Sequence, residues 1–149
     1  MLARRLTRHS RAGSGVDAGL AHDALQEAVE AILLGTVIAG RPVPGPGELG
    51  VPVEPYLSGV ADLSGELRRL SLQRLSGGDL KGAEAFLVAM EEVHSVLMRF
   101  ETARPILALK PKQDTSRALV ERTRGDLTLA RVLSRVPGAA SVRPSGDGE

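Results

Sequence analysis

The stretch YLSGVADLSGELRRL, from Tyr56 to Leu70, decides the fold class of this chain of 149 residues. Its apolar side chains recur every three or four residues, which is the spacing of one face of an amphipathic helix. We therefore predict a helix from about Pro55 to Leu75. Its apolar stripe is formed by Leu57, Val60, Leu63, Leu67 and Leu70.

Two features of this helix are not explained by packing alone. Asp62 and Glu66 lie one helical turn apart, so two like charges share a face. Gly59 and Gly65 lie inside the helix, although glycine destabilises a helix interior by about 1 kcal/mol relative to alanine. Both features have ordinary structural interpretations, because glycines are often points of close helix packing and paired carboxylates often form a solvated face.

The same apolar spacing predicts three further helices, from Asp17 to about Ala39, from about Leu80 to Phe100 and from roughly Asp114 to Arg135. Residues 40–55 contain too many prolines and glycines for regular structure, so we expect a loop there and a second connector at residues 101–113. The expected stripes comprise Leu25, Val29, Ile32, Leu33 and Thr36, then Ala83, Phe86, Leu87, Met90, Val93 and Leu97, and finally Leu119, Val120, Leu127, Leu129 and Val132.

These elements predict an all-α, antiparallel bundle of about four main helices. The helical domain spans residues 17–135, and Asp79 is a good N-cap for the helix that follows the turn SGGD. A flexible basic arm at residues 1–16 and a disordered tail at residues 136–149 complete the expected organisation.

Composition narrows the functional classes. The chain is 42% hydrophobic and 25% charged, as globular proteins are, and its 2% of aromatic residues favours helices over sheets. It has no cysteine, which excludes disulfides and cysteine-ligated zinc. No apolar run approaches the roughly 18–20 residues that cross a bilayer. We expect a soluble, cytoplasmic protein with no membrane partner and no small-molecule cofactor.

Acidic residues on the first two helices form the candidate site. Asp23, Glu27 and Glu30 fall on one side of the first helix, opposite its apolar stripe. Two helices joined by one loop can pack antiparallel, which would bring this face near Asp62 and Glu66. Clustered carboxylates repel one another unless a cation lies between them, and such oxygen ligands suit Mg²⁺ or Mn²⁺. The alternative is again a solvated face.

The motif LQEAVEA (25–31), followed by the stretch from Tyr56 to Leu70, resembles the translin family and in particular its translin-associated factor X branch. The resemblance continues through SGGD (76–79) and through RALVERTRGDL (117–127), which looks like the archaeal and bacterial members. It covers roughly residues 20–130. It implies an all-α bundle and a Mg²⁺-dependent endoribonuclease that acts on single-stranded RNA within oligomeric assemblies.

The resemblance carries the family's carboxylates onto this chain one at a time. Glu27 and Glu30 match the two glutamates of Q-E-x-V-E-A, and Asp62 matches the aspartate of G-V-A-D-L. Glu66 matches a supporting acidic position. By this resemblance Glu27, Glu30 and Asp62 are catalytic and, with Glu66, bind Mg²⁺ or Mn²⁺, whose bound water attacks the phosphodiester. The translin branch proper lacks the full set, which favours an active nuclease.

Arg68 and Arg69 directly follow the acidic face and are the candidates for binding RNA phosphates. Exposed arginines also serve only solubility, so this role has a structural alternative. The expected partners are single-stranded RNA or DNA and further copies of the chain in a homo-oligomer. The competing hypotheses are a catalytically inactive subunit that binds single-stranded nucleic acid or supports assembly, and a plain helical scaffold.

The start of the chain is unusual for this family. Its members carry about three further helices before the first acidic helix, whereas only about 20 residues precede that helix here. Three explanations compete: a mis-assigned start, a genuine truncated paralogue, and a compact version that completes its core by oligomerising.

Overall fold

The computed structural model describes residues 15–100 and 109–136. Within these ranges there are five helices and no strand, which confirms the all-α prediction. No helix among them is long and apolar enough to span a membrane. The helices are α2 (Gly15–Ile38), α3 (Pro46–Leu49), α4 (Val53–Ser76), α5 (Leu80–Arg99) and α6 (Leu109–Leu133). Two predicted segments lie almost entirely outside the described residues: the arm, of which only residues 15–16 are described, and the tail, of which only residue 136 is described.

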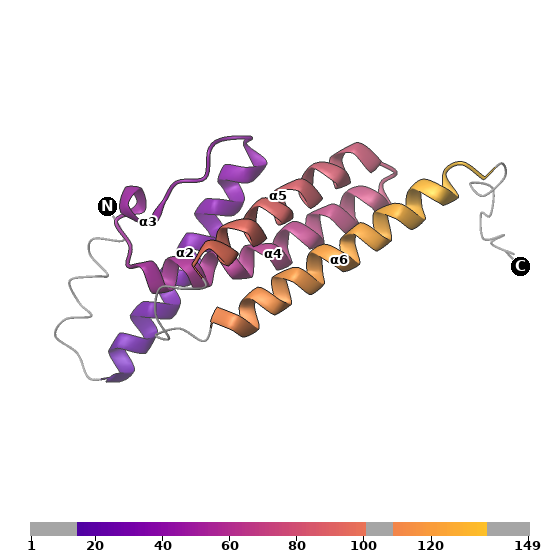
Figure 1. Ribbon diagram of the computed structural model, residues 1–149. Helices are drawn as coiled ribbons and strands as arrows, with labels where there is room; N and C mark the ends of the chain where they lie inside the picture. Colours follow the sequence, from indigo (N-terminus) through magenta and orange to yellow (C-terminus); the bar gives the residue numbers. More distant parts are fainter. Residues whose placement is uncertain (1–14, 101–108, 137–149) are drawn as a thin grey trace, which may run out of the picture.

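The central element is α4, which contacts α2, α5 and α6 (Figure 1). The helix α5 runs antiparallel to α4, and α6 runs beside both in the direction of α4. The predicted stripe of α4 faces this core, and only Leu70 at its end is half-buried. The core of the bundle includes Leu57, Val60, Leu63 and Leu67 of α4, Met90, Val93 and Leu97 of α5, and Val120 of α6.

The turn between α4 and α5 confirms the predicted cap. Asp79 lies at the N-cap of α5, and its Oδ1 accepts a hydrogen bond from the backbone N–H of Gly82 at 2.8 Å. Gly78 has a φ of +78°, a left-handed conformation that glycine adopts without a steric penalty. Cap and glycine together fix the short reversal that makes α4 and α5 neighbours.

The last helix begins earlier than predicted, at Leu109 instead of Asp114. Pro111 lies in its first turn, where the missing N–H has no partner inside the helix in any case. Leu109 is buried, and Gln113 donates from Nε2 to the carbonyl oxygen of Leu97 at 3.0 Å. Tertiary contacts therefore stabilise a first turn that the sequence pattern did not reveal.

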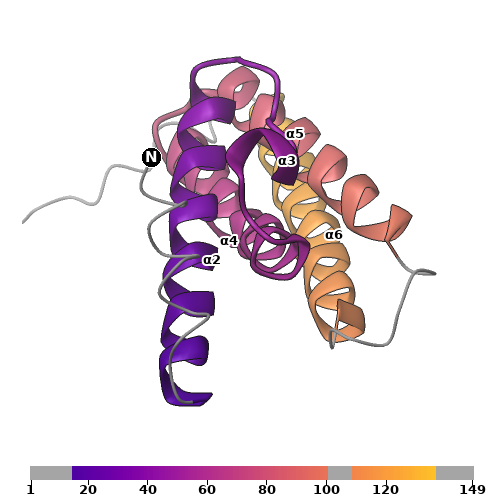
Figure 2. The ribbon, with the colours of Figure 1, turned by 90° about the vertical axis from the view of Figure 1, so that its left-hand side faces the viewer.

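The first two long helices do not pack antiparallel, although two helices joined by one loop can do so. In both views α2 crosses α4 obliquely (Figures 1 and 2), because the linker at residues 39–52 leads the chain back to the start of α4 instead of reversing it at once. Tyr56 holds the linker by donating from its hydroxyl to the carbonyl oxygen of Pro44 at 3.0 Å.

Gly59 lies at the point where α2 crosses α4. A Cβ atom there would approach both the backbone oxygen of Gln26 and the Cγ1 of Val29 to 2.8 Å, which is closer than packed atoms allow. Around Gly65 a Cβ atom would meet nothing within 4 Å. The packing interpretation therefore holds for Gly59 and not for Gly65.

Some residues of the predicted stripes are exposed. Ile32 of α2 is 47% exposed, because α4 is the helix that α2 mainly contacts and it covers only a narrow face. Leu129 and Val132 of α6 are 59% and 54% exposed. They belong to the last turns of α6, which extend past the turn between α4 and α5 (Figure 1).

Candidate functional site

Asp62 is the centre of a polar cluster to which three helices contribute. Its Oδ2 accepts a hydrogen bond at 2.5 Å from Nε2 of Gln26, which lies on α2. The Nζ of Lys112, from the first turn of α6, lies 2.9 Å from Oδ1 and 3.1 Å from Oδ2. The carboxylate of α4 is thus held from both sides, by an amide and by an ammonium group.

The other predicted carboxylates lie near enough to one another for their charges to act on Glu30. Burial raises the pKa of Glu30, and the negative charges of Glu27, Asp62 and Glu66 raise it further, while Lys112 lowers it. These electrostatic effects require the charges to lie near Glu30. The charges of both acidic faces therefore act on Glu30, although α2 crosses α4 instead of lying antiparallel to it.

Glu66 and Arg69 form an ion pair on the surface of α4. The Oε2 of Glu66 accepts hydrogen bonds from Nε and Nη2 of Arg69 at 2.9 and 2.6 Å. The Arg69 side chain is 64% exposed, so its guanidinium remains accessible to a phosphate. Because Arg69 is paired with Glu66, this candidate phosphate ligand lies at the edge of the acidic cluster, by which we mean Glu27, Glu30, Asp62 and Glu66.

Arg68 contacts the bundle instead. Its Nη1 donates to Oγ1 of Thr123 at 2.8 Å, and its Nη2 lies 2.9 Å from Oδ2 of Asp126. Both partners are on α6, and the Arg68 side chain is only 21% exposed. In this structure Arg68 therefore joins α4 to α6, and of the two predicted phosphate ligands only Arg69 faces open solvent.

The four carboxylates are oxygen ligands of the kind that hard divalent cations prefer. Burial first, and then the negative charges of Glu27, Asp62 and Glu66, disfavour the ionised form of Glu30, and Mg²⁺ or Mn²⁺ would offset the repulsion between these charges. Within residues 15–100 and 109–136, however, no three acidic or histidine side chains are grouped closely enough to share one ion. A divalent cation here would require side chains to move, first of all at Asp62, beside which Lys112 supplies the positive charge.

Sequence reasoning missed two residues of this cluster. Gln26 lies inside the motif LQEAVEA, directly before Glu27, and could have been noticed there as a donor. Lys112 was assigned to a connector, since the last helix was expected to begin at Asp114. Only the three-dimensional structure places it opposite Asp62.

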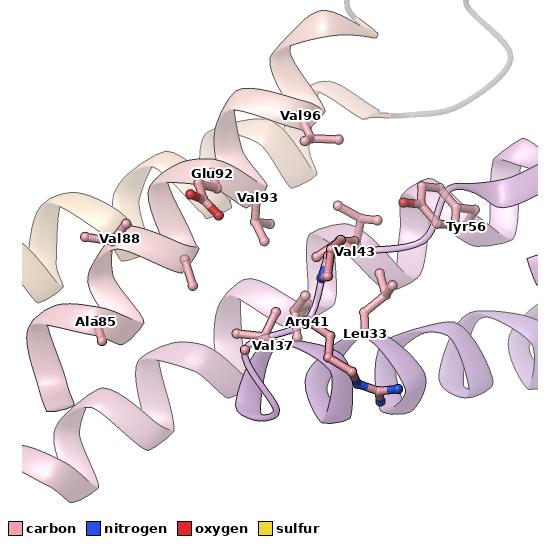
Figure 3. Close-up of a pocket in the computed structure, with 15 residues that line it drawn as sticks. Leu33, Val37, Arg41, Val43, Tyr56, Ala85, Val88, Glu92, Val93 and Val96 are labelled. Atoms are coloured by element: carbon pink, nitrogen blue, oxygen red, sulfur yellow. The ribbon is translucent and has the colours of Figure 1, made fainter. Parts of the chain in front are cut away.

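A separate groove contains none of the acidic residues of the cluster. It measures about 490 Å³, runs between α2, α4 and α5, and is lined mainly by apolar side chains (Figure 3). Arg41 and Glu92 are the charged groups that border it. Its composition matches neither phosphate nor metal chemistry, so the acidic cluster is the better candidate site.

Comparison with known proteins adds to this geometry. Residues 22–123 match the model of the translin family. The chain belongs to the translin family. The matched segment contains all four predicted carboxylates as well as Gln26 and Lys112.

The relatives of this translin-family chain are longer than the chain itself. An uncharacterised protein from Methanocaldococcus jannaschii is 36% identical over 103 residues, which cover 68% of this chain and 46% of that protein. The chain thus spans less than half the length of this curated relative.

Solved structures show the same helical bundle. The crystal structure of AfC3PO is 36% identical and superposes with a TM-score of 0.78 over 90% of this chain and 70% of that one. The structure of AfC3PO in complex with duplex RNA gives 35% identity and a TM-score of 0.77 over 89% and 69% of the two chains. The crystal structure of apo-NeC3PO follows at 26% identity and a TM-score of 0.69, over 77% and 61%.

Proposed function

We propose that this translin-family chain is a metal-dependent endoribonuclease of the translin-associated factor X type, and that it works as a homo-oligomer. The observation that carries the proposal is the convergence of Glu27, Glu30, Asp62 and Glu66 where α2 crosses α4. A plain scaffold has no need to place three further carboxylates where their charges raise the pKa of Glu30.

Each residue of the cluster has a role in this proposal. Glu27, Glu30 and Asp62 would hold Mg²⁺ or Mn²⁺, with Glu66 in support. When bound, such an ion lowers the pKa of a water and offsets the negative charge that develops on the attacked phosphodiester. One of the carboxylates would act as the general base for the attacking water. Gln26 orients Asp62 through its 2.5 Å hydrogen bond.

RNA is the proposed substrate because AfC3PO, at 35% identity, has been solved with duplex RNA. The strandedness of the substrate for this chain is a separate part of the proposal, and we favour single-stranded RNA. Arg69 is the proposed phosphate ligand, since its exposed guanidinium adjoins Glu66 at the edge of the cluster. Arg68 would act indirectly by joining α4 to α6.

A second function is favoured by specific contacts. Lys112 pairs with Asp62 and Arg69 pairs with Glu66, so two of the four carboxylates are already neutralised by side chains of the chain itself. This arrangement fits a catalytically inactive subunit that binds nucleic acid. Such a subunit would bind RNA with a steep dependence on salt and with no requirement for metal.

The two functions are separated by one assay. The purified chain is incubated with labelled RNA, single-stranded or as a duplex of the same sequence, in Mg²⁺ or in EDTA. We expect cleavage of the single strand in Mg²⁺ only, and a loss of at least about 100-fold in Glu30→Gln. Glu121→Gln is the matched control, because Glu121 is exposed on α6 outside the cluster.

Each outcome assigns the function. Cleavage that survives EDTA or Glu30→Gln would contradict the metal mechanism at this site. RNA binding without cleavage, from a folded and oligomeric preparation, would establish the inactive subunit instead. Cleavage of the duplex alone would correct the substrate and leave the site unchanged.

A further inference from the structure

Lys112 is the cation that the acidic cluster contains beside Asp62. Its ammonium group lies 2.9 and 3.1 Å from the two oxygens of Asp62, so it contacts both atoms through which that carboxylate could bind a metal. The two side chains are 31% and 36% exposed, which makes this a half-buried ion pair.

The Lys112 ammonium and a divalent cation cannot both contact Asp62 in this way. An ammonium group has only donors and cannot act as a ligand, and two cations a few ångströms apart repel each other. A metal ion that takes an oxygen of Asp62 must therefore displace the Lys112 ammonium group from that oxygen. Gln26 need not move in the same way, because its neutral amide contacts only Oδ2.

The surroundings of Lys112 allow its head to move while its backbone stays in place. The neighbouring Gln113 is buried and bonded to the carbonyl oxygen of Leu97. One turn later, the hydroxyls of Ser116 and Ser64 lie 3.0 Å apart in the interior. The backbone of this turn is thus fixed, whereas the four-carbon stem of lysine is flexible.

The helix itself weakens the hold on Lys112. The first turn of a helix carries a partial positive charge, so a lysine there is less favourable than a carboxylate. Asp62 overcomes this effect, but the resulting pair is easier to separate than one in which the helix dipole also attracts the cation. Both the flexible stem and this repulsion favour an exchangeable counter-ion.

We propose that Lys112 is a displaceable counter-ion of the acidic cluster. Without metal, Lys112 pairs with Asp62, and a divalent cation that binds Asp62 must displace the ammonium group. The proposal rests on the proposed function in assuming that the cluster binds such a cation. Lys112 acts as a positioning residue: it pairs with Asp62 when no metal is bound and thereby sets the affinity with which metal binds.

The experiment measures Mn²⁺ binding to the full chain without RNA, by the loss of the free-ion signal in electron paramagnetic resonance. The variants are Lys112→Met, Lys112→Arg and Asp62→Asn. Lys110→Met is the matched control, because Lys110 lies in the same turn and its Nζ is 3.4 Å from Asp114 of its own helix, away from the cluster. Circular dichroism confirms that each variant is helical.

We expect Lys112→Met to bind Mn²⁺ about tenfold more tightly than the wild type, because the competing charge is gone. Its thermal midpoint in EDTA should fall and should rise more on addition of Mn²⁺. Lys112→Arg should bind no more tightly than the wild type, Lys110→Met should change affinity less than about twofold, and Asp62→Asn should abolish the tight site.

The result distinguishes this inference from the proposed function. If Mn²⁺ binding depends on Asp62 but is equally tight in Lys112→Met and the wild type, the counter-ion role is overturned and the metal site stands. If neither protein binds Mn²⁺ in a manner that depends on Asp62, the metal-dependent function fails and the inference fails with it.

Discussion

The two sides of α4 are held by very different means. Towards α5 and α6, contacts continue along the helix: Ser64 pairs with Ser116, Arg68 bonds to Thr123, and Ser71 donates to the carbonyl oxygen of Ala83 at 3.0 Å. Towards α2, the helices cross obliquely and the specific contacts gather around the crossing, at Gly59 and at the hydrogen bond between Gln26 and Asp62.

This difference separates folding from the site. The unit of α4, α5 and α6 supplies most of the buried core and several polar contacts between helices. The helix α2 supplies Glu27 and Glu30, half of the acidic cluster, and it is placed mainly by its crossing with α4, whereas α4, α5 and α6 each contact the other two. We infer that the site is easier to disrupt than the fold, and three predictions test this inference.

The largest effect is expected from the three-helix unit. Leu67 is completely buried on α4. Leu67→Ala should lower the free energy of unfolding by about 2–5 kcal/mol, since the lost apolar contacts leave a cavity. Denaturant unfolding followed by circular dichroism measures this change. Leu72→Ala on the same helix is the control, because Leu72 is 37% exposed and should lose less than about 1 kcal/mol. Equal losses in both variants would refute this description of the core.

A smaller and local effect is expected at the crossing. In Gly59→Ala the new methyl group collides with the backbone of Gln26 and with Val29, and such overpacking costs about 1–3 kcal/mol. Because Gln26 lies in α2, we expect that helix to move away while the other helices remain packed. Hydrogen exchange should therefore accelerate in α2 and stay slow in α4, α5 and α6.

The second glycine of α4 is the matched control for this prediction. In Gly65→Ala the methyl group meets nothing within 4 Å, so only helix propensity changes and the chain should gain up to about 1 kcal/mol. Slower exchange in α2 of Gly59→Ala, or faster exchange in Gly65→Ala, would contradict the different roles assigned to the two glycines.

The smallest effect concerns the electrostatics of the crossing. Burial and the neighbouring carboxylates raise the pKa of Glu30 above its ordinary value of 4.5, so the folded chain binds this proton more tightly than the unfolded chain. The associated stability is therefore present below pH 4.5 and is lost as the pH rises through the folded pKa. In EDTA, Glu30→Gln should be more stable than the wild type at neutral pH, and its advantage should shrink as the pH falls through the raised pKa of Glu30 towards 4.5. Unfolding curves at several pH values measure this difference, and an advantage independent of pH would rule out the carboxylate repulsion.

The sequence predicted the three-helix unit better than the crossing, for a physical reason. Apolar spacing identifies the face that a helix buries, and Leu63 and Leu67 of α4 lie where it placed them. Spacing does not tell how many neighbours cover a helix, so Ile32 of α2 was expected inside and is exposed.

The residues of the site likewise divide into those that local sequence patterns predict and those that only tertiary structure brings together. Asp62 and Glu66 could be found because they are neighbours on one helical face. Lys112 could not, since its partner lies 50 residues away in the chain and its helix was expected to begin two residues after it. The cation of the cluster is thus a product of tertiary structure, whereas its carboxylates belong to local motifs.

The pair of buried hydroxyls at Ser64 and Ser116 has a consequence for the axial register of α6. Leucine side chains tolerate sliding of one helix along another, because a leucine that leaves one apolar neighbour can pack equally well against the next. A hydroxyl in the interior does not, since a shift of one turn would leave both oxygen atoms without a partner. This pair therefore opposes translation of α6 along α4. It also keeps Lys112, which lies one turn nearer the start of α6, level with Asp62 along the helix axis.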